Sequence, residues 1–125
     1  MKTIVNSPKA PAPIGPYSQA VIANNILYVS GQIAIDQATG EINNSTIEEE
    51  TKQVMINLGH ILKEAKADYV NILKCSIFIK DMGQFAQINA VYGEFFPSDP
   101  PARETVEVSE LPKGVNVEIS CIAQL

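Results

Sequence analysis

The residue best suited to bind a carboxylate is Arg103, the only arginine among nine basic residues. Its planar guanidinium presents N–H groups in a fork that matches both carboxylate oxygens, which a lysine ammonium cannot do. Pro100 and Pro101 lie just before it and stiffen the backbone at the start of a predicted strand. Arg103 is therefore a candidate ligand for a small acid. The alternative is a surface arginine paired with Glu104 or Glu107, and composition alone favours that alternative.

Glu118 interrupts an otherwise apolar segment, VNVEISCIA, near the end of the chain. Side chains alternate between the faces of a strand, so Glu118 shares a face with Asn116 and Ser120. By the same count Arg103 shares a face with Thr105. We expect the two C-terminal strands to be adjacent and to bring Arg103, Thr105 and Glu118 to one surface, where they form a site for a small acid. The alternative is a solvated strand face.

Other kinds of chemistry lack the residues they need. His60 is the only histidine and has no partners at metal-ligand spacing, so we expect an exposed helix residue and no metal site. Ser30 and Thr105 have no second histidine to activate them as nucleophiles. Cys75 and Cys121 lack the spacing of a redox pair and are predicted to be buried free thiols. No phosphate-binding glycine loop occurs, so no nucleotide cofactor is indicated.

The length and charge of the chain limit the kinds of protein it can be. Its 125 residues are 46% hydrophobic, which predicts one domain spanning residues 1–125. Nine basic and fourteen acidic residues give a net charge of −5 without a basic run, so we expect no nucleic-acid partner. The first twenty residues contain four prolines and no apolar run. We therefore expect neither a signal peptide nor a membrane span, and a cytoplasmic protein.

The N-terminal half contains the elements that must position Gly31 and its neighbours. Four prolines between Ser7 and Pro16 exclude a helix and predict an ordered arm or loop. Two apolar runs between Val21 and Ile35 flank Asn24 and Asn25, which predicts a hairpin. Gly31 within the second run indicates either a bulge or a close approach of another group to the backbone.

Two helices and three more strands follow. Ser45 and Glu48 have the spacing of a capping box, and helical periodicity to Ala65 predicts a helix whose polar face, with Glu50 and Gln53, is exposed. A strand is expected from Val70 to Lys80, a second helix capped by Asp81, and strands over residues 103–108 and 115–123. The order ββαβαββ predicts an α+β domain with one mixed sheet and both helices on one face. The other face is then left for solvent or a partner.

Several short blocks occur together in a characteristic order. They are Ile14 to Ala20, Ser30 to Ile33, Asn89 to Tyr92, Pro101 to Arg103, Val106 to Val108, Leu111 to Lys113 and Val117 to Ile119. This ordered set resembles the Rid (reactive intermediate deaminase) family, RidA branch. The resemblance implies a chorismate-mutase-like α+β domain that forms a homotrimer, with sheets around a central barrel and sites in the clefts between subunits.

The resemblance also implies an activity. RidA-type proteins hydrolyse short 2-enamines and 2-imines, such as 2-aminoacrylate and 2-aminocrotonate, to 2-keto acids and ammonia, and need no cofactor. These intermediates come from pyridoxal-phosphate-dependent serine and threonine dehydratases. The alternative function is a non-catalytic trimer that binds 2-keto acids in a regulatory or chaperone-like role.

The family's functional residues match particular positions of this sequence. Arg103 matches the clamp for the substrate carboxylate, the Gly31 backbone matches a second ligand contact, and Glu118 matches the glutamate beside the attacking water. Thr105 stands where bacterial members often have cysteine, and its hydroxyl can still hydrogen-bond water. Further positions match residues around the pocket: Tyr17, Ser30, Phe85 and Asn89.

Overall fold

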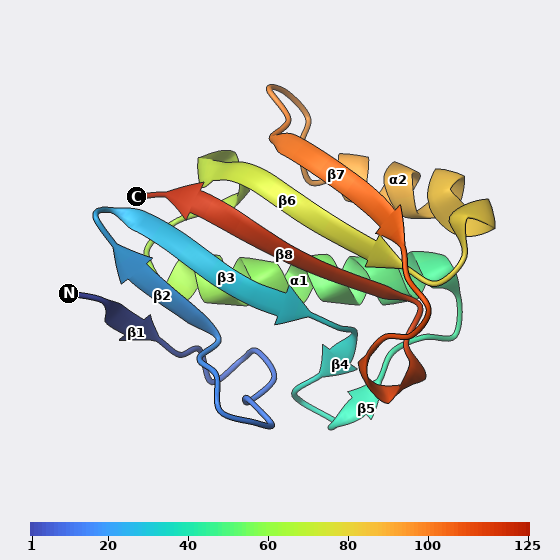
Figure 1. The fold of residues 1–125 in the computed structure, drawn as a ribbon, viewed down its shortest axis with the longest axis horizontal. Coiled ribbons are helices and arrows are strands. Elements are labelled where there is room, and N and C mark those ends of the chain that lie inside the picture. The colour runs from blue at the N-terminus through green and yellow to red at the C-terminus, as the bar shows by residue number, and fades with distance from the viewer.

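A computed structural model describes all residues, 1–125, and contains one six-stranded sheet with the order β1-β2-β3-β8-β6-β7 (Figure 1). Only the β6–β7 pair is parallel; the other neighbours in the sheet are antiparallel. A separate two-stranded hairpin joins β4 and β5. The elements are β1 (Thr3–Val5), β2 (Ala20–Ala23), β3 (Ile26–Gln32), β4 (Ile35–Asp36), β5 (Glu41–Ile42), α1 (Ile47–Glu64), β6 (Ile72–Ile79), α2 (Phe85–Gly93), β7 (Ala102–Glu107) and β8 (Val117–Gln124).

Both helices cover the same face of the sheet, the rear face in Figure 1, as the sequence predicts. The buried core lies between this face and α1, and Leu27, Leu58 and Ile119 in it are fully or almost fully buried. The opposite face, here called the open face, carries no helix and exposes Tyr28 and Val106. The expected α+β fold with a mixed sheet is therefore confirmed. No helix combines the length and apolar character needed to cross a bilayer.

The predicted hairpin and N-terminal arm are both present. Asn24 and Asn25 form the turn between β2 and β3 with φ angles of 51° and 62°, a conformation that asparagine tolerates better than most residues. The proline-rich arm is held by the buried side chain of Gln19, which accepts from the Ser7 N–H and donates to carbonyls of the arm. The arm is therefore ordered without belonging to the sheet.

The order ββαβαββ omits three short strands. The chain starts with β1 at the sheet edge, and the segment after β3 forms the β4–β5 hairpin. These strands have only two or three residues, which is too short for an alternating pattern to appear in the sequence. Tertiary pairing, not local propensity, defines them.

The start and polar side of α1 differ from the expectation. Thr46, not Ser45, caps the helix, and its hydroxyl accepts from the Glu49 N–H at 3.1 Å, so the pair Ser45–Glu48 is not the cap. Glu50 and Gln53, expected in solvent, are buried: Glu50 accepts from the Asn116 N–H just before β8, and Gln53 donates to Asn57 of the same helix. His60, also expected to be exposed, is half-buried, and burial lowers its pKa, as do Lys9 and Lys63.

Candidate functional site

Sheet register places Arg103 and Glu118 on opposite faces. The two C-terminal strands are not adjacent, because β6 lies between β7 and β8. Arg103 is paired with Cys75 of β6, whereas Glu118 is paired with Phe78. Cys75 and Phe78 are three residues apart on one strand, so their side chains point to opposite faces. The expectation that Arg103, Thr105 and Glu118 share one surface of the chain is therefore wrong: only Arg103 and Thr105 do.

Arg103 lies on the helix-covered side, against α2. Its guanidinium carbon is 5.5 Å from the ring centre of Phe85 and 5.2 Å from that of Tyr92, distances at which cation–π attraction holds the group in place. Its Nη1 donates to Oδ1 of Asn89. These residues recur at positions i, i+4 and i+7 of α2, so one helix face forms the cradle. A cavity of about 350 Å³ opens beside Arg103; we call it the Arg103 pocket.

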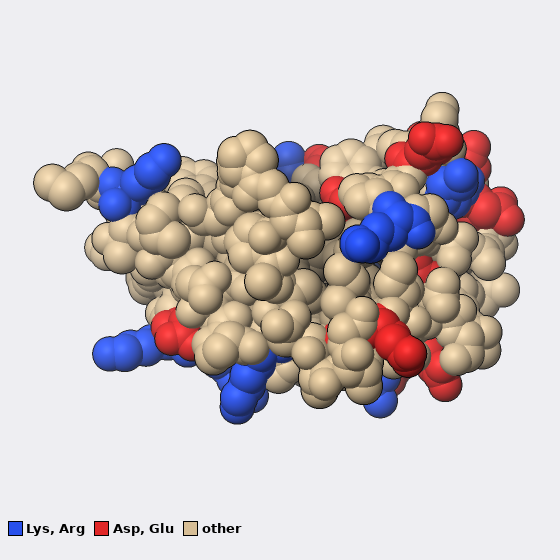
Figure 2. All heavy atoms as spheres, turned by 90° about the horizontal axis from the view of Figure 1, so that it is seen from below, with Lys and Arg blue, Asp and Glu red and all other residues tan.

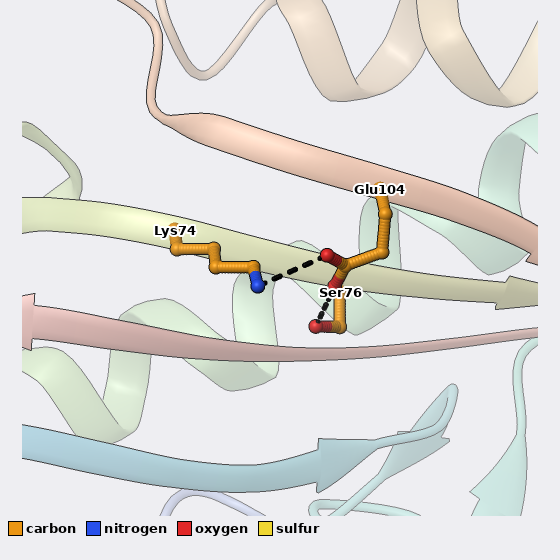
Figure 3. Close-up of polar contacts among 3 residues, drawn as sticks. All are labelled: Lys74, Ser76 and Glu104. Atoms are coloured by element: carbon orange, nitrogen blue, oxygen red, sulfur yellow. Dashed lines mark hydrogen bonds and ion pairs between the residues drawn. The ribbon is translucent and has the colours of Figure 1, made fainter.

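No carboxylate of the chain neutralises Arg103. Glu104 pairs instead with Lys74 at 3.0 Å and accepts from the Ser76 hydroxyl on the open face (Figure 3). Glu107 accepts from the Met82 N–H at 2.7 Å. The Lys74–Glu104 pair is the only ion pair in the chain. The alternative of a surface arginine paired with a neighbouring glutamate is thus excluded, and most guanidinium N–H groups remain free for an anionic ligand.

Glu118 lines a second cavity, of about 390 Å³, between the N-terminal arm and the end of β3. We call it the Glu118 pocket. The rest of its lining is mainly apolar. The other lining residues are Pro11, Ala12, Ile14, Tyr17, Ser30, Gly31, Gln32, Ile33, Ile35 and Pro112. Burial raises the pKa of the Glu118 carboxyl, and no side chain or backbone group of the chain hydrogen-bonds it. A carboxylate in such surroundings is a better proton acceptor than one in water.

Gly31 and Glu118 are in close contact. The ladder between β3 and β8 shifts register between Val29 and Gln32, so the predicted bulge is confirmed. A Cβ atom built on Gly31 would lie 2.5 Å from Oε2 and 2.8 Å from Cδ of Glu118. The absence of a side chain at Gly31 therefore makes room for the carboxylate.

We expect Gly31→Ala to displace the Glu118 carboxylate while leaving the fold intact. The clash involves the end of a flexible side chain, and the φ angle of Gly31 is one that alanine adopts. Any activity that needs this carboxylate should fall about tenfold or more, because misplacement of a reacting group by 1 Å is costly. Urea unfolding should change by no more than about 1 kcal/mol. Wild-type activity in a folded Gly31→Ala protein would show that the contact does not fix the carboxylate.

The sequence-predicted site residues fall into two groups. Phe85, Asn89 and Thr105 lie with Arg103, and Thr105 Oγ1 is buried there without a hydrogen-bond partner. The other group, Tyr17, Ser30 and Gly31, lies with Glu118. The expected site residues of one chain therefore lie in two separate groups, which we call half-sites.

Two supporting residues were missed as parts of the site. Tyr92 belongs to one of the matched blocks but not to the expected site residues, although its spacing from Phe85 and Asn89 indicates the shared helix face. Gln19 positions Pro11 of the Glu118 pocket by donating to its carbonyl at 2.9 Å. No local pattern marks Gln19, because its partners lie 8 to 12 residues earlier in a segment without regular structure.

The family model described as Endoribonuclease L-PSP matches residues 7–125, which is nearly the whole chain. This is also the model of the RutC and Rid proteins. The chain belongs to the Rid family. The resemblance found in the sequence blocks is therefore confirmed.

Two curated relatives of this Rid protein are matched over most of their length. A RutC family protein of Synechocystis is 48% identical over 124 residues, covering 98% of this chain and 95% of the relative. The 2-iminobutanoate/2-iminopropanoate deaminase of Bos taurus is 43% identical over 123 residues, covering 98% and 90%. Of these two relatives, which are similarly identical to this chain, one is named after its family and the other after a specific activity.

Solved structures match the fold equally well. The Rid family protein YyfA from Yersinia pestis superposes with a TM-score of 0.97 at 44% identity, covering 100% of both chains. TdcF of E. coli, solved with bound serine, superposes with a TM-score of 0.94 at 36% identity, covering 98% of each chain. The sheet and helices described above are therefore the Rid fold.

Proposed function

We propose that this Rid protein hydrolyses 2-enamines and 2-imines of short 2-keto acids, releasing the keto acid and ammonia. The observation that carries the proposal is the pair of half-sites: an arginine without a carboxylate partner and a half-buried glutamate without a hydrogen-bond donor. The name of the bovine relative and the serine bound to TdcF support a small ligand with an α-carboxylate. The substrates 2-aminoacrylate and 2-aminocrotonate meet this description.

The chemistry needs one anion clamp and one proton carrier. The Arg103 fork binds the substrate carboxylate, which orients the imine carbon. Glu118 takes a proton from water as the water oxygen bonds to that carbon, and returns a proton to nitrogen as the carbon–nitrogen bond breaks. A 2-enamine first becomes the imine as a proton moves from its nitrogen to C3. Water and imine are then converted to keto acid and ammonia, so no cofactor or metal takes part in the proposed reaction. β-Elimination by pyridoxal-phosphate enzymes supplies such imines.

A homotrimer with sheets around a central barrel completes the proposed site. Arg103 and Glu118 lie on opposite faces of one sheet, so a single substrate cannot contact both within one chain. If the open face packs on a neighbouring copy, the Glu118 pocket of one copy can meet the Arg103 pocket of the next. Sedimentation should then give about 41 kDa, three times the 13.6 kDa of one chain.

Mixing two inactive variants tests this shared site. Arg103→Ala and Glu118→Gln, each nearly inactive alone, are unfolded together at equal concentration and refolded. Random assembly places an intact Arg103 opposite an intact Glu118 at about a quarter of the sites, so about a quarter of wild-type activity should return. Mass spectrometry confirms that mixed trimers form. Mixed trimers without recovered activity would mean that the site does not combine Arg103 and Glu118 of different copies.

RNA cleavage, suggested by the name of the family model, has less support. Phosphate backbones bind clustered Lys and Arg side chains. In the face drawn in Figure 2, the basic side chains are separated from one another and interspersed with acidic ones. The net charge of −5 also opposes binding of a polyanion. The deaminase is therefore the better account of this chain.

A further inference from the structure

The side of α1 that faces the sheet carries buried polar residues in an otherwise apolar surface. Glu50, Gln53 and Asn57 are 0%, 9% and 0% exposed. Their spacing of three and four residues places them in one row along the helix, here called the polar stripe. Burying such groups costs free energy unless they are hydrogen-bonded. The partners of these side chains show what the stripe does.

Glu50 holds the start of β8. Its Oε2 accepts from the backbone N–H of Asn116 at 2.7 Å and of Val117 at 3.2 Å. Its Oε1 accepts from Nδ2 of Asn116 at 2.8 Å. Glu118 is the next residue along the strand. A fully buried carboxylate thus fixes the backbone directly before the proposed catalytic glutamate.

Asn57 holds the opposite wall of the Glu118 pocket. Its Nδ2 donates to the carbonyls of Ile33 and Ile35, both at 2.9 Å. These two residues line the pocket and follow Gly31 in the chain. Gln53 supports Asn57 by donating from Nε2 to Oδ1 of Asn57 at 3.0 Å, which orients the Asn57 amide.

We propose that the polar stripe is a positioning device that sets the gap between Glu118 and the Gly31–Ile35 wall. The Glu118 carboxyl makes no hydrogen bond of its own and lies against Gly31, so its place depends on the two backbones. Hydrogen bonds are directional and fix these backbones in a way that apolar packing does not. Glu50, Gln53 and Asn57 therefore act through Glu118 without contacting substrate. The catalytic consequence rests on the proposed function; the positioning itself does not.

The test compares Glu50→Gln with a matched control, Thr51→Val. Glutamine keeps the shape of Glu50 but turns one acceptor oxygen into an NH₂ group that faces N–H donors. Thr51 is equally buried on the same helix, but its hydroxyl bonds only to the carbonyl of Ile47 within α1. Both variants lose buried hydrogen bonds, and only Glu50→Gln loosens the pocket.

The first readout is the pKa of the Glu118 carboxyl, measured by carbon-detected NMR and assigned with Glu118→Gln. Tyr17 is the only other titratable residue that lines the pocket. In Glu50→Gln, water should reach the carboxyl, and its raised pKa should fall toward the ordinary value. The acid limb of the kcat profile should move to lower pH with it. We expect kcat to fall about tenfold with KM within about twofold, and Thr51→Val to change neither.

An unchanged Glu118 pKa and pH profile in Glu50→Gln, with a stability loss like that of Thr51→Val, would overturn the proposal. If Glu50→Gln does not fold, Gln53→Met gives the same test, because methionine is nearly isosteric, Gln53 is the least buried of the three stripe residues, and the change frees the Asn57 amide. The NMR readout does not need turnover. Absence of deaminase activity in the wild type would therefore reject the proposed function, while the pKa comparison would still decide the role of the stripe.

Discussion

Glu118→Gln is expected to lose about 10²-fold or more in kcat toward 2-aminocrotonate while still binding 2-ketobutyrate, a loss of about 2.7 kcal/mol of transition-state stabilisation. Glutamine fills the same space in the Glu118 pocket but cannot accept a proton from water. Under the proposed function, binding of a keto acid requires no proton transfer and depends on the Arg103 clamp. A coupled assay and calorimetry on the same preparation measure the two effects.

The raised pKa of Glu118 gives this prediction a pH dependence. Wild-type activity should fall as pH drops through that pKa, because the carboxyl then becomes protonated. Between the ordinary glutamate pKa of 4.5 and the raised value, the folded protein binds more protons at Glu118 than the unfolded chain does. The contribution of Glu118 to the free energy of unfolding therefore decreases as pH rises through this window. In urea unfolding, the free energy of unfolding of Glu118→Gln relative to that of the wild type should increase as pH rises through the same window.

Two outcomes would contradict the role of Glu118. If turnover survives in Glu118→Gln while keto-acid binding is lost, Glu118 is a ligand contact and not the proton carrier. If the wild type binds 2-ketobutyrate but never hydrolyses the imine, the non-catalytic binding function replaces the deaminase.

Arg103→Lys is expected to impair turnover almost as severely as Arg103→Ala, with kcat/KM reduced about 10²-fold. The guanidinium is held by the rings of Phe85 and Tyr92 and by the Asn89 amide, an arrangement that requires a flat group with several N–H donors. A lysine ammonium is a point charge and cannot form the two parallel hydrogen bonds to a carboxylate. The coupled assay with 2-aminocrotonate measures the change.

The matched control, Lys52→Arg, replaces an exposed lysine of α1 by arginine. Lys52 lies on the surface and forms no ion pair. Lys52→Arg should leave kcat/KM and the unfolding midpoint unchanged, since surface substitutions usually have small effects. A normal rate for Arg103→Lys would reject the clamp, because only a solvated arginine tolerates this replacement.

Local patterns in the sequence determined most of the individual elements. Asn24 and Asn25 marked a hairpin that the positive φ angles confirm, and helical periodicity found α1. Gly31 marked a bulge, and the ordered blocks identified the Rid family. Each of these features depends on neighbouring residues or on a match of short segments, so each can be recognised without the tertiary structure.

The tertiary structure alone decided which residues come together. Period-two alternation shows which residues share a face within one strand, but it says nothing about which strands pair or in what register. The insertion of β6 between β7 and β8 placed Arg103 and Glu118 on opposite faces of the sheet. Glu50 looked like a solvated helix residue because its three donors lie 66 and 67 residues away in the chain. Such contacts form only when the whole sheet closes on α1, and no local pattern encodes them.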